Sequence, residues 1–465
     1  MATTPPTLTA LASPPVSAAT DKMRQEGLPE IAIDTFAHYE ERLRSGEQGL
    51  LPEAQLEPLT DVPSAEDLPA GDETAIERVV VLKLNGGLGT SMGMTRAKSL
   101  LEVKEGHSFL EVIARQVLHL REQHDAAIPL LLMNSFATRD DTLKALKSYP
   151  ELEIDGLPLD FVQGKVPKLL ADDFEPVRWE ADPTLEWAPP GHGDVFTSLA
   201  TSGTLSTLLE RGYEYLFLSN SDNLGAVLEP RILSWLASEE LPFVSEVVDR
   251  TEADRKGGHL ARRRNGGDLV LRETAQVPGE DQDAFEDVAR HRFFNANNIW
   301  VNLHALQRTL DERDGILGLP MIVNRKTVDP TDPSSPEVVQ LETAMGAAIA
   351  VFDGAAAVHV PRQRFTPVKT TSDLLVVRSD AYDLSDDWTI QLTPERDAAP
   401  LVELSNEFKL LHDFEERFPA GAPSLRAAEE LEVESDVRFG SGVVVRGRVK
   451  VKGPASIPDG AVLKG

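Results

Sequence analysis

Apolar residues in the middle of the chain form short unbroken runs, separated by stretches with helical spacing. Residues 79–84 read Val-Val-Val-Leu-Lys-Leu, a β-branched run that is typical of a buried strand. Similar runs predict further strands at residues 128–133, 215–219, 243–248, 299–301 and 357–360. Between the first two runs, Ser108 and Glu111 form a capping box ahead of a helix whose apolar residues are spaced by three and four. This alternation predicts an α/β fold with a largely parallel sheet.

Two of the predicted strands lead into polar, turn-forming sequence. The first leads into Asn-Gly-Gly-Leu-Gly-Thr-Ser-Met-Gly at residues 85–93, and the strand at 215–219 leads into Asn-Ser-Asp-Asn at 220–223. In sheets of this kind, ligands bind at the carboxyl ends of the strands. We therefore expect a binding site where these two turns meet.

Near its end the chain changes to a period of six residues. Small apolar residues recur at this interval in two registers, which are Val437, Val443, Val449, Ala455 and Ala461, and Val445, Val451, Ile457 and Leu463. A hexapeptide repeat in two registers predicts a parallel β-helix of roughly two coils. The alternative is a plain β-meander with chance spacing.

These patterns divide the chain into four segments. Residues 1–20 are rich in Pro, Thr, Ser and Ala, which predicts a disordered tail. Residues 21–75 predict a helical segment that packs on the core, and residues 76–375 hold the α/β domain with both polar turns. Residues 376–465 predict a C-terminal domain, with the β-helix at about 431–465.

Composition and charge exclude several classes of protein. The chain of 465 residues has a net charge of −30 and no cysteine, so a disulfide framework, a thiolate metal site and a catalytic thiol are excluded. The negative field repels nucleic acid and anionic membranes, and we expect neither as a partner. Neither a signal peptide nor a membrane-spanning run is evident, so the expected location is the cytoplasm.

Four segments carry residues that suit phosphate chemistry. The glycines at 86, 87, 89 and 93 could bring backbone N–H groups close to a phosphate, with Lys98 as a nearby cation. The loop fits neither a dinucleotide fingerprint nor a P-loop, because Met92 and Ala97 stand where those motifs require glycine. A purely structural turn is the alternative.

The other three segments are less specific on their own. His192 lies in a Pro-Pro-Gly-His-Gly-Asp loop, with Asp194 as a suitable N-cap of the next helix. Asp222 could hold Mg²⁺, which often takes one or two carboxylates and completes its shell with substrate phosphates. Lys369 is followed by three hydroxyl residues. A structural histidine, an ordinary surface carboxylate and a solvated lysine are the alternatives, but together the four segments predict transfer between phosphates.

At these residues the chain resembles the eukaryotic-type UTP–glucose-1-phosphate uridylyltransferase (UDP-glucose pyrophosphorylase) family. The resemblance includes LNGGLGTSMG at 84–93, WAPPGHGD at 187–194, LFLSNSDNLGA at 216–226, FFNANNIW at 293–300 and PRQRFTPVKTTSDLL at 361–375, in family order. It implies a Rossmann-like, GT-A-like nucleotidyltransferase core with a mixed sheet and a C-terminal left-handed parallel β-helix. It also implies a cytoplasmic enzyme that makes UDP-glucose and pyrophosphate from UTP and glucose 1-phosphate, with Mg²⁺ as cofactor.

The resemblance implies roles for the matching residues. Those for nucleotide binding are Leu84, Asn85, Gly86, Gly87, Lys98, Gln163, Gly191, Asn220, Asp222 and Lys369. Those for the sugar phosphate are His192, Gly258, Glu273, Asn297 and Asn298. Lys98 and Lys369 would be catalytic, and Asp222 would hold the metal. Arg96 and Ala97 replace the family's Gly-Pro, which leaves the conformation of this loop open.

Two alternative functions remain open at this stage. One is a related UDP-sugar or UDP-N-acetylglucosamine pyrophosphorylase. The other is a non-catalytic scaffold that binds nucleotide, although the presence of Lys98, Asp222 and Lys369 argues against it. A homo-oligomer formed through the C-terminal β-helix is also left open.

Overall fold

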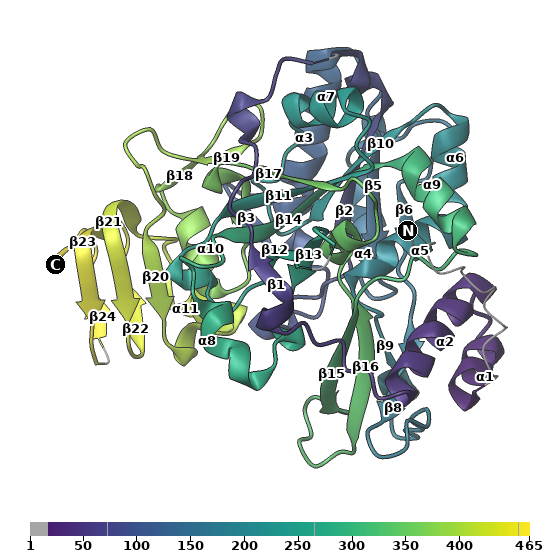
Figure 1. Cartoon of the computed structure of the whole chain (residues 1–465). Helices are drawn as coiled ribbons and strands as arrows, with labels where there is room; N and C mark the ends of the chain where they lie inside the picture. The colour runs from purple at the N-terminus through teal and green to yellow at the C-terminus, as the bar shows by residue number, and fades with distance from the viewer. Residues whose placement is uncertain (1–16, 72, 265, 454) are drawn as a thin grey trace.

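The centre of the computed structural model, which describes residues 17–71, 73–264, 266–453 and 455–465, is a ten-stranded sheet (Figure 1). Its strands are β1 (Leu56–Pro58), β2 (Val79–Asn85), β5 (Leu130–Asn134), β6 (Asp160–Val162), β10 (Tyr215–Asn220), β11 (Phe243–Asp249), β12 (His259–Arg263), β13 (Leu269–Arg272), β14 (Phe293–Asn302) and β17 (Ala356–His359). The order along the main path is β1-β12-β14-β10-β2-β5-β6, with β13 beside β12, β11 beside β14 and β17 beside β11. All six strands expected from the sequence are present.

The sheet is mixed, as the family resemblance implies, which corrects the largely parallel sheet expected from the alternation of strands and helices. Strands β10, β2, β5 and β6 are parallel neighbours, whereas β14 pairs antiparallel with β10, β11 and β12. The reason is that β12 and β13 form a hairpin, and β14 then returns through the middle of the sheet. The apolar run at 299–301 lies near the end of β14, because three asparagines, at 295, 297 and 298, interrupt the strand before it.

Helices cover both faces of the sheet, and alternate residues of β2 face each layer. Val79 and Val81 pack in a cluster with α3 and α7, whereas Val80 and Leu82 pack with α5, α6 and α9. The helices are α1 (Ala18–Gln25), α2 (Glu30–Arg44), α3 (Phe109–His124), α4 (Arg139–Leu146), α5 (Val195–Thr201), α6 (Thr204–Glu210), α7 (Pro230–Ser238), α8 (Gln282–Glu286), α9 (Leu303–Glu312), α10 (Thr371–Arg378) and α11 (Leu411–Arg417). The predicted capping box of Ser108 and Glu111 opens α3. A strand buried on both faces explains the unbroken apolar run.

The N-terminal segment forms two helices and one edge strand. Residues 1–16 of the predicted tail lie outside the described residues, but residues 18–20 belong to α1, which corrects the expected end of the tail. Ser17 starts this helix early because it forms a capping box with Thr20. Helix α2 packs through Phe36 and Tyr39 on the sheet of β8 (Leu169–Leu170), β15 (Met321–Thr327) and β16 (Glu337–Thr343). Strand β1 pairs with β12 at the edge of the central sheet.

The C-terminal part contains two sheets whose neighbouring strands are all parallel. One sheet is β20 (Leu401–Leu404), β21 (Ser424–Val433), β23 (Val444–Val451) and β25 (Val462–Lys464), and the other is β22 (Val437–Phe439) and β24 (Ala455–Ile457). Leu431 pairs with Val449 and Val444 with Val462, an offset of three six-residue repeats. A meander is thereby excluded, because its neighbouring strands would be antiparallel.

The six-residue repeat marks positions that point inward. Val437, Val443 and Val445 are fully buried, and Val449 and Ile457 are nearly so. Of Ala455 only the backbone belongs to the described part. Short antiparallel pairs complete the structure, namely β3 (Glu102–Lys104) with β4 (His107–Ser108), β7 (Val166–Pro167) with β9 (Trp187–Ala188), and β18 (Tyr382–Leu384) with β19 (Ile390–Leu392). Within the described ranges, no helix is both long enough and apolar enough to cross a bilayer.

Candidate functional site

The two polar turns predicted from the sequence do meet. Lys98 opens a short 3₁₀ turn after the glycine loop, and its backbone N–H donates to the carbonyl of Gly87 at 3.0 Å. Its Nζ donates to Asp222 Oδ2 at 2.7 Å, and both side chains are mostly shielded from solvent. The other carboxylate oxygen, Asp222 Oδ1, is buried and has no hydrogen-bond partner among the described atoms. Such an oxygen is suited to bind a cation.

The glycine loop lies beside two more of the predicted nucleotide-binding residues. Gly89 and Gly93 have φ values of +67° and +74°, which favour glycine at both places. A Cβ on Gly86 would lie 3.0 Å from Gln163 Oε1, so the backbone and this amide are in close contact. Gln163 Nε2 in turn donates to the carbonyl of Gly191 at 3.0 Å. Three residues that are far apart in the sequence are therefore neighbours at one end of the sheet.

His192 is held with a defined tautomer. Its Nδ1 accepts a hydrogen bond from the Met345 N–H at 3.0 Å, so in the neutral ring the proton is on Nε2. Burial, together with the positive charge of Lys369, lowers the pKa of the imidazole to about 4. At neutral pH the ring is therefore an uncharged N–H donor.

The lowered pKa of His192 predicts a loss of stability in acid. The unfolded chain takes up a proton near the ordinary histidine pKa of 6.5, whereas the folded protein does so only near 4. The contribution of the neutral His192 to the free energy of unfolding is thus complete above pH 6.5, and it is lost as the pH falls towards 4. We expect the free energy of unfolding of H192Q to fall less steeply over this interval than that of the unchanged chain. Urea unfolding at pH 7 and pH 5 measures the difference, and the exposed His304, changed to glutamine, serves as the control. Equal slopes for all three proteins would contradict the prediction.

Lys369 belongs to a segment that runs along the Asp222 turn. The Val368 N–H donates to the Asp222 carbonyl at 3.0 Å, and Pro367 forms a β-bridge with Asn223. The Lys369 side chain is exposed. Its charge acts on His192, as described, and also counteracts the effect of burial, which raises the pKa of the Glu273 carboxyl. Lys369 is therefore close to the Asp222 turn, to His192 and to Glu273.

Gly258 and Glu273 face each other at the base of the β12–β13 hairpin. A Cβ on Gly258 would lie 2.7 Å from Glu273 Oε2, and the Gly258 carbonyl accepts from the Asn295 N–H at 3.1 Å. Burial is the main reason why the pKa of Glu273 is raised. The pair forms a polar wall near Lys369.

The predicted asparagines have different surroundings. Asn297 adopts a left-handed φ of +57°, donates from Nδ2 to Asn220 Oδ1 at 3.2 Å, and keeps a buried Oδ1 without a described partner. Asn298 is fully buried, and both its amide nitrogen and its oxygen are engaged with protein groups. Asn85 is similar, since its Nδ2 donates to Asn134 and Thr142. Leu84 is partly buried beside it. The side-chain NH₂ of Asn85 is therefore engaged with protein groups, as is its backbone carbonyl, which accepts from Thr138 Oγ1 at 2.7 Å. Asn298 lies too deep in the protein to line a sugar site.

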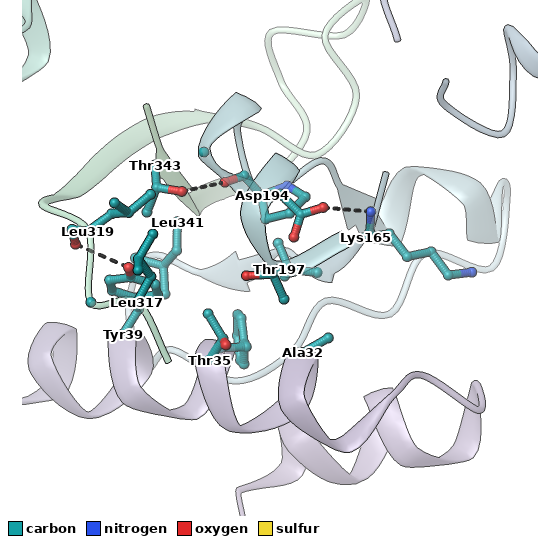
Figure 2. A pocket seen from close by; sticks show the side chains of 16 residues that line it. Ala32, Thr35, Tyr39, Lys165, Asp194, Thr197, Leu317, Leu319, Leu341 and Thr343 are labelled. Carbon is teal, nitrogen blue, oxygen red and sulfur yellow. Dashed lines mark hydrogen bonds between the residues drawn. The ribbon is translucent and has the colours of Figure 1, made fainter. Parts of the chain in front are cut away.

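Asp194 does not cap a helix, which corrects the expectation from the sequence. The turn from His192 runs directly into α5, so Asp194 already has helical backbone angles instead of the extended ones of a capping residue. Its carboxylate accepts from the Gly164 N–H at 2.7 Å (Figure 2). It also accepts from Ser198 Oγ at 2.6 Å. It also borders a small hollow towards α2, where Tyr39 donates to the Leu319 carbonyl at 3.1 Å. Asp194 therefore connects the His192 loop, to which it belongs, with the loop that contains Gly164.

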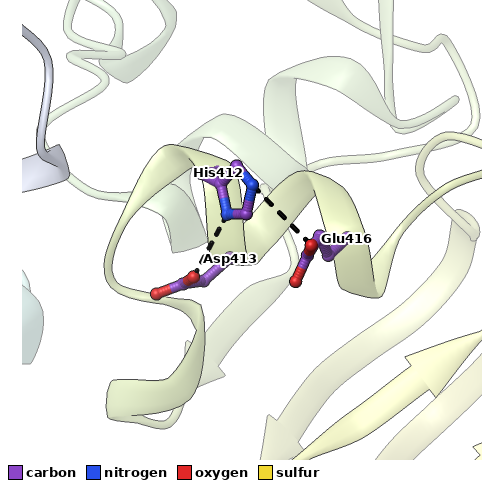
Figure 3. Close-up of side chains that lie close together, drawn as sticks. All are labelled: His412, Asp413 and Glu416. Atoms are coloured by element: carbon purple, nitrogen blue, oxygen red, sulfur yellow. Dashed lines mark hydrogen bonds and ion pairs between the residues drawn. The ribbon is translucent and has the colours of Figure 1, made fainter.

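A cluster of one histidine and two carboxylates lies close enough together to hold a metal ion. His412, Asp413 and Glu416 lie together on α11, with separations of 3.4 and 3.7 Å from the imidazole to the two carboxylates (Figure 3). His412 is 79% exposed, and nothing else around the cluster points to a ligand. The buried oxygen of Asp222 is the better candidate.

Sequence reasoning missed a group of buried polar residues behind the site. Glu246, Arg364 and Asn223 were not selected, although all three are buried. Lys83 is also buried, and its Nζ donates to Ser219 Oγ at 2.7 Å. In the sequence, Lys83 inside the otherwise apolar run at 79–84 was the available indication of this group, because a buried charge requires polar partners.

Comparisons with known proteins agree with this geometry. A family model described as UTP–glucose-1-phosphate uridylyltransferase matches residues 33–446. Proteins of that name from Hordeum vulgare and Solanum tuberosum are 44% and 45% identical to this chain over 412 and 408 residues. The matches cover 87% and 86% of this chain, and 84% and 83% of theirs.

Solved structures are equally similar. The UDP-glucose pyrophosphorylase from Leishmania major, known in open and closed structures, has a TM-score of 0.91 at 43% identity, covering 96% of this chain and 97% of the other. A variant of that protein in complex with UDP-glucose has a TM-score of 0.92 at 42% identity, covering 98% and 99%. A UDP-glucose phosphorylase from Trypanosoma brucei has a TM-score of 0.87 at 44% identity, covering 96% and 99%. Together with the family match over most of its length, these likenesses show that the chain belongs to the UTP–glucose-1-phosphate uridylyltransferase family.

Proposed function

We propose that this chain makes UDP-glucose and pyrophosphate from UTP and glucose 1-phosphate, in a reversible reaction. The observation that carries the proposal is the contact of Lys98 with Asp222 after the ends of β2 and β10, with the Lys369 segment hydrogen-bonded to the same turn. The curated relatives bear the name of this activity, and the Leishmania major structure cited above was solved with UDP-glucose. Direct transfer needs no covalent intermediate on the protein, because a phosphate oxygen of the sugar phosphate can itself attack.

The residues near the glycine loop are proposed to bind the nucleotide. Their backbone groups would approach the phosphates, and Gln163 would meet the uracil edge. Nucleotide-side residues are Leu84, Asn85, Gly86, Gly87, Gln163, Gly191 and Asn220. On the sugar side we propose Gly258, Glu273 and Asn297, with the His192 Nε2–H donating to the phosphate of glucose 1-phosphate. Asn297 Oδ1 supports this assignment, because it is buried and finds no hydrogen-bond partner in the part of the chain that the structure describes.

Asp222 fits the role of a Mg²⁺ ligand. Its Oδ1 is buried without a described partner, and its Oδ2 contacts a lysine that could turn to a phosphate instead. One carboxylate is sufficient when substrate phosphates complete the shell. When bound, Mg²⁺ would withdraw charge from the phosphate oxygens and thereby stabilise the transition state.

The proposed reaction is an in-line displacement. A phosphate oxygen of glucose 1-phosphate attacks the α-phosphorus of UTP, a new P–O bond forms, and the bond to the β-phosphate oxygen breaks to release pyrophosphate. The attacking oxygen is already an anion, so no general base is required. The main obstacle is repulsion between the two anions, and Lys98, Lys369 and the loop N–H groups would reduce it in a partly shielded site.

A direct assay tests this function. Purified protein is supplied with Mg²⁺, glucose 1-phosphate and each nucleoside triphosphate in turn, and pyrophosphate is followed. We expect release with UTP alone among them. A second series with UTP and several sugar 1-phosphates, compared by kcat/KM, should favour glucose. A preference for N-acetylglucosamine 1-phosphate or equal rates would support a related pyrophosphorylase, and binding of UTP without turnover would support a scaffold.

Gly87 allows a test of the loop that does not disturb folding. A Cβ at this position meets no protein atom within 4 Å, so G87A should leave the free energy of unfolding within about 0.5 kcal/mol of the original value. If the loop N–H groups hold phosphates, the added methyl group would prevent their close approach and raise KM for UTP by about tenfold or more, the cost of one lost charge-assisted contact. Steady-state kinetics measures this change.

Gly279 is the matched control for Gly87. A Cβ on Gly279 also meets nothing within 4 Å, and this residue lies on a surface turn outside the site. G279A should leave KM unchanged. Equal KM values for G87A and G279A would remove the loop from phosphate binding.

We also propose finer points of organisation. The two parallel C-terminal sheets would be faces of a left-handed β-helix, supported by the regular offset of three repeats between paired strands. Residues 76–375 would form the catalytic domain and 376–465 the C-terminal one. We also propose a cytoplasmic location and a homo-oligomer formed through the C-terminal sheets. Light scattering of the full chain measures the oligomeric state.

A further inference from the structure

A buried ion pair lies behind the candidate site. Glu246 is on β11, and Arg364 ends the short turn that precedes the Lys369 segment. Arg364 Nε donates to Glu246 Oε2 at 2.9 Å and Nη2 donates to Oε1 at 2.6 Å. Glu246 is fully buried and Arg364 is 9% exposed. Burial alone would lower the pKa of the guanidinium, but Glu246 more than compensates and the pKa is raised. The two hydrogen bonds from one guanidinium to both carboxylate oxygens make the pair bidentate.

The ion pair is the centre of a hydrogen-bond network. Trp300 Nε1 donates to Glu246 Oε1 at 2.9 Å, and Asn298 Nδ2 donates to Oε2 at 2.9 Å. Arg364 Nη2 also donates to the Val227 carbonyl at 2.8 Å. The carboxylate thus accepts from three different side chains, which fixes its orientation inside the fold.

The network reaches the site through Asn223, the residue after Asp222. Asn223 Nδ2 donates to the carbonyl of Arg364 at 3.0 Å. Its Oδ1 accepts from the Thr366 N–H at 3.0 Å. One amide therefore joins the Asp222 turn to two points of the segment that leads to Lys369.

The two segments also have no space to shift relative to each other. A Cβ on Gly225 would collide with the Gln363 carbonyl and would come within 3.0 Å of Thr366 Oγ1. Together with the bond from the Val368 N–H to the Asp222 carbonyl, this close packing makes the Asp222 turn and the Lys369 segment a single unit.

We propose that Glu246 and Arg364 are positioning residues, which hold the Lys369 segment against the Asp222 turn so that Lys369 reaches the reacting phosphates. This inference rests on the proposed function. The Lys369 side chain is exposed, so the position of its backbone is what directs its charge. An error of about 1 Å in the position of a catalytic group can reduce the rate by about 10²-fold.

A double-mutant cycle with Lys369 tests the proposal. R364K keeps the charge but loses the bidentate geometry. We expect it to lower kcat by about 10²-fold with little change in KM for UTP. In a K369A background the same change should cost less than about 3-fold, because the group that Arg364 positions is already absent. If Arg364 only stabilised the fold, R364K would lower kcat by the same factor in both backgrounds.

Arg362 provides the matched control. It belongs to the same short turn and also binds a carboxylate with two nitrogens, at 2.7 and 3.0 Å, but its partner Asp254 is outside the site and Arg362 itself is exposed. R362K should retain kcat within about 2-fold. Circular dichroism checks that each variant is folded. E246Q, which preserves the shape of the carboxylate, enters the same cycle if R364K does not fold.

Equal losses in both backgrounds, or no loss from R364K in the unchanged background, would overturn the proposal. The release of pyrophosphate by the unchanged chain is measured first. Its absence would refute the proposed function, whereas its presence with additive losses would refute the positioning role alone.

Discussion

Replacing Lys369 with alanine lowers kcat/KM by about 10²-fold or more, which is the usual cost of losing one preorganised charge contact. The physical reason is that both proposed substrates are anions, and the positive charge of Lys369 acts on His192 and Glu273 from a segment that is hydrogen-bonded to the Asp222 turn. Initial rates of pyrophosphate release, with each substrate varied in turn, measure the loss. We expect the decrease mainly in kcat, because the repulsion is greatest when the oxygen and the α-phosphorus approach.

Two further variants define what is lost in K369A. K369R should recover part of the rate, since it restores the charge with different geometry. Lys452, an exposed lysine that pairs with Glu434 in the C-terminal sheet, is the control, and K452A should turn over normally. Unchanged turnover in K369A would exclude Lys369 from the mechanism.

Replacing Asp222 with asparagine is expected to reduce kcat by roughly 10³-fold, at the upper end for one electrostatic contact. The change replaces one carboxylate oxygen with an NH₂ group, and it removes the negative charge that serves both the buried Oδ1, which could hold Mg²⁺, and the ion pair with Lys98. The Mg²⁺ concentration required for half-maximal rate should rise as well. Binding of Mn²⁺ in the presence of UTP, followed by electron paramagnetic resonance, gives a readout that does not depend on turnover.

Asp254 separates the loss of a metal ligand from the loss of an ion pair. Its carboxylate is also held by a cation, Arg362, but outside the site. D254N should keep both the rate and the affinity for Mn²⁺. If D222N bound Mn²⁺ as tightly as D254N, the assignment of the metal to Asp222 would be wrong.

The sequence predicts those parts of the fold in which one local pattern has one structural cause. The run at 79–84 is unbroken because both faces of β2 are covered, and Ser108 with Glu111 marks the start of α3. Strand β1 was not predicted. It has three residues and ends in Pro58, so it has no periodicity to detect and is formed only through its partner β12.

The site was predictable wherever residues end a strand or carry a charge in a loop. Lys98 and Asp222 are in contact, as the positions of their turns suggest. The sequence does not indicate whether Asn298 faces the site. Its neighbour Asn297 takes a left-handed φ, so that Asn297 contacts Asn220 whereas Asn298 contacts the buried Glu246. The pairing of Glu246 with Arg364 joins residues more than a hundred positions apart. No spacing in a single sequence indicates such a contact.

The place of β1 has a consequence for shortened forms of the protein. It occupies one edge of the central sheet, and α2 covers apolar side chains of β15 and β16. Proteolytic loss of the first sixty residues would expose the backbone donors and acceptors of β12. It would also expose the apolar side chains of β15 and β16 that α2 covers. Bare sheet edges recruit other chains, so such a fragment would be inclined to aggregate even though every group proposed to take part in the chemistry is still present.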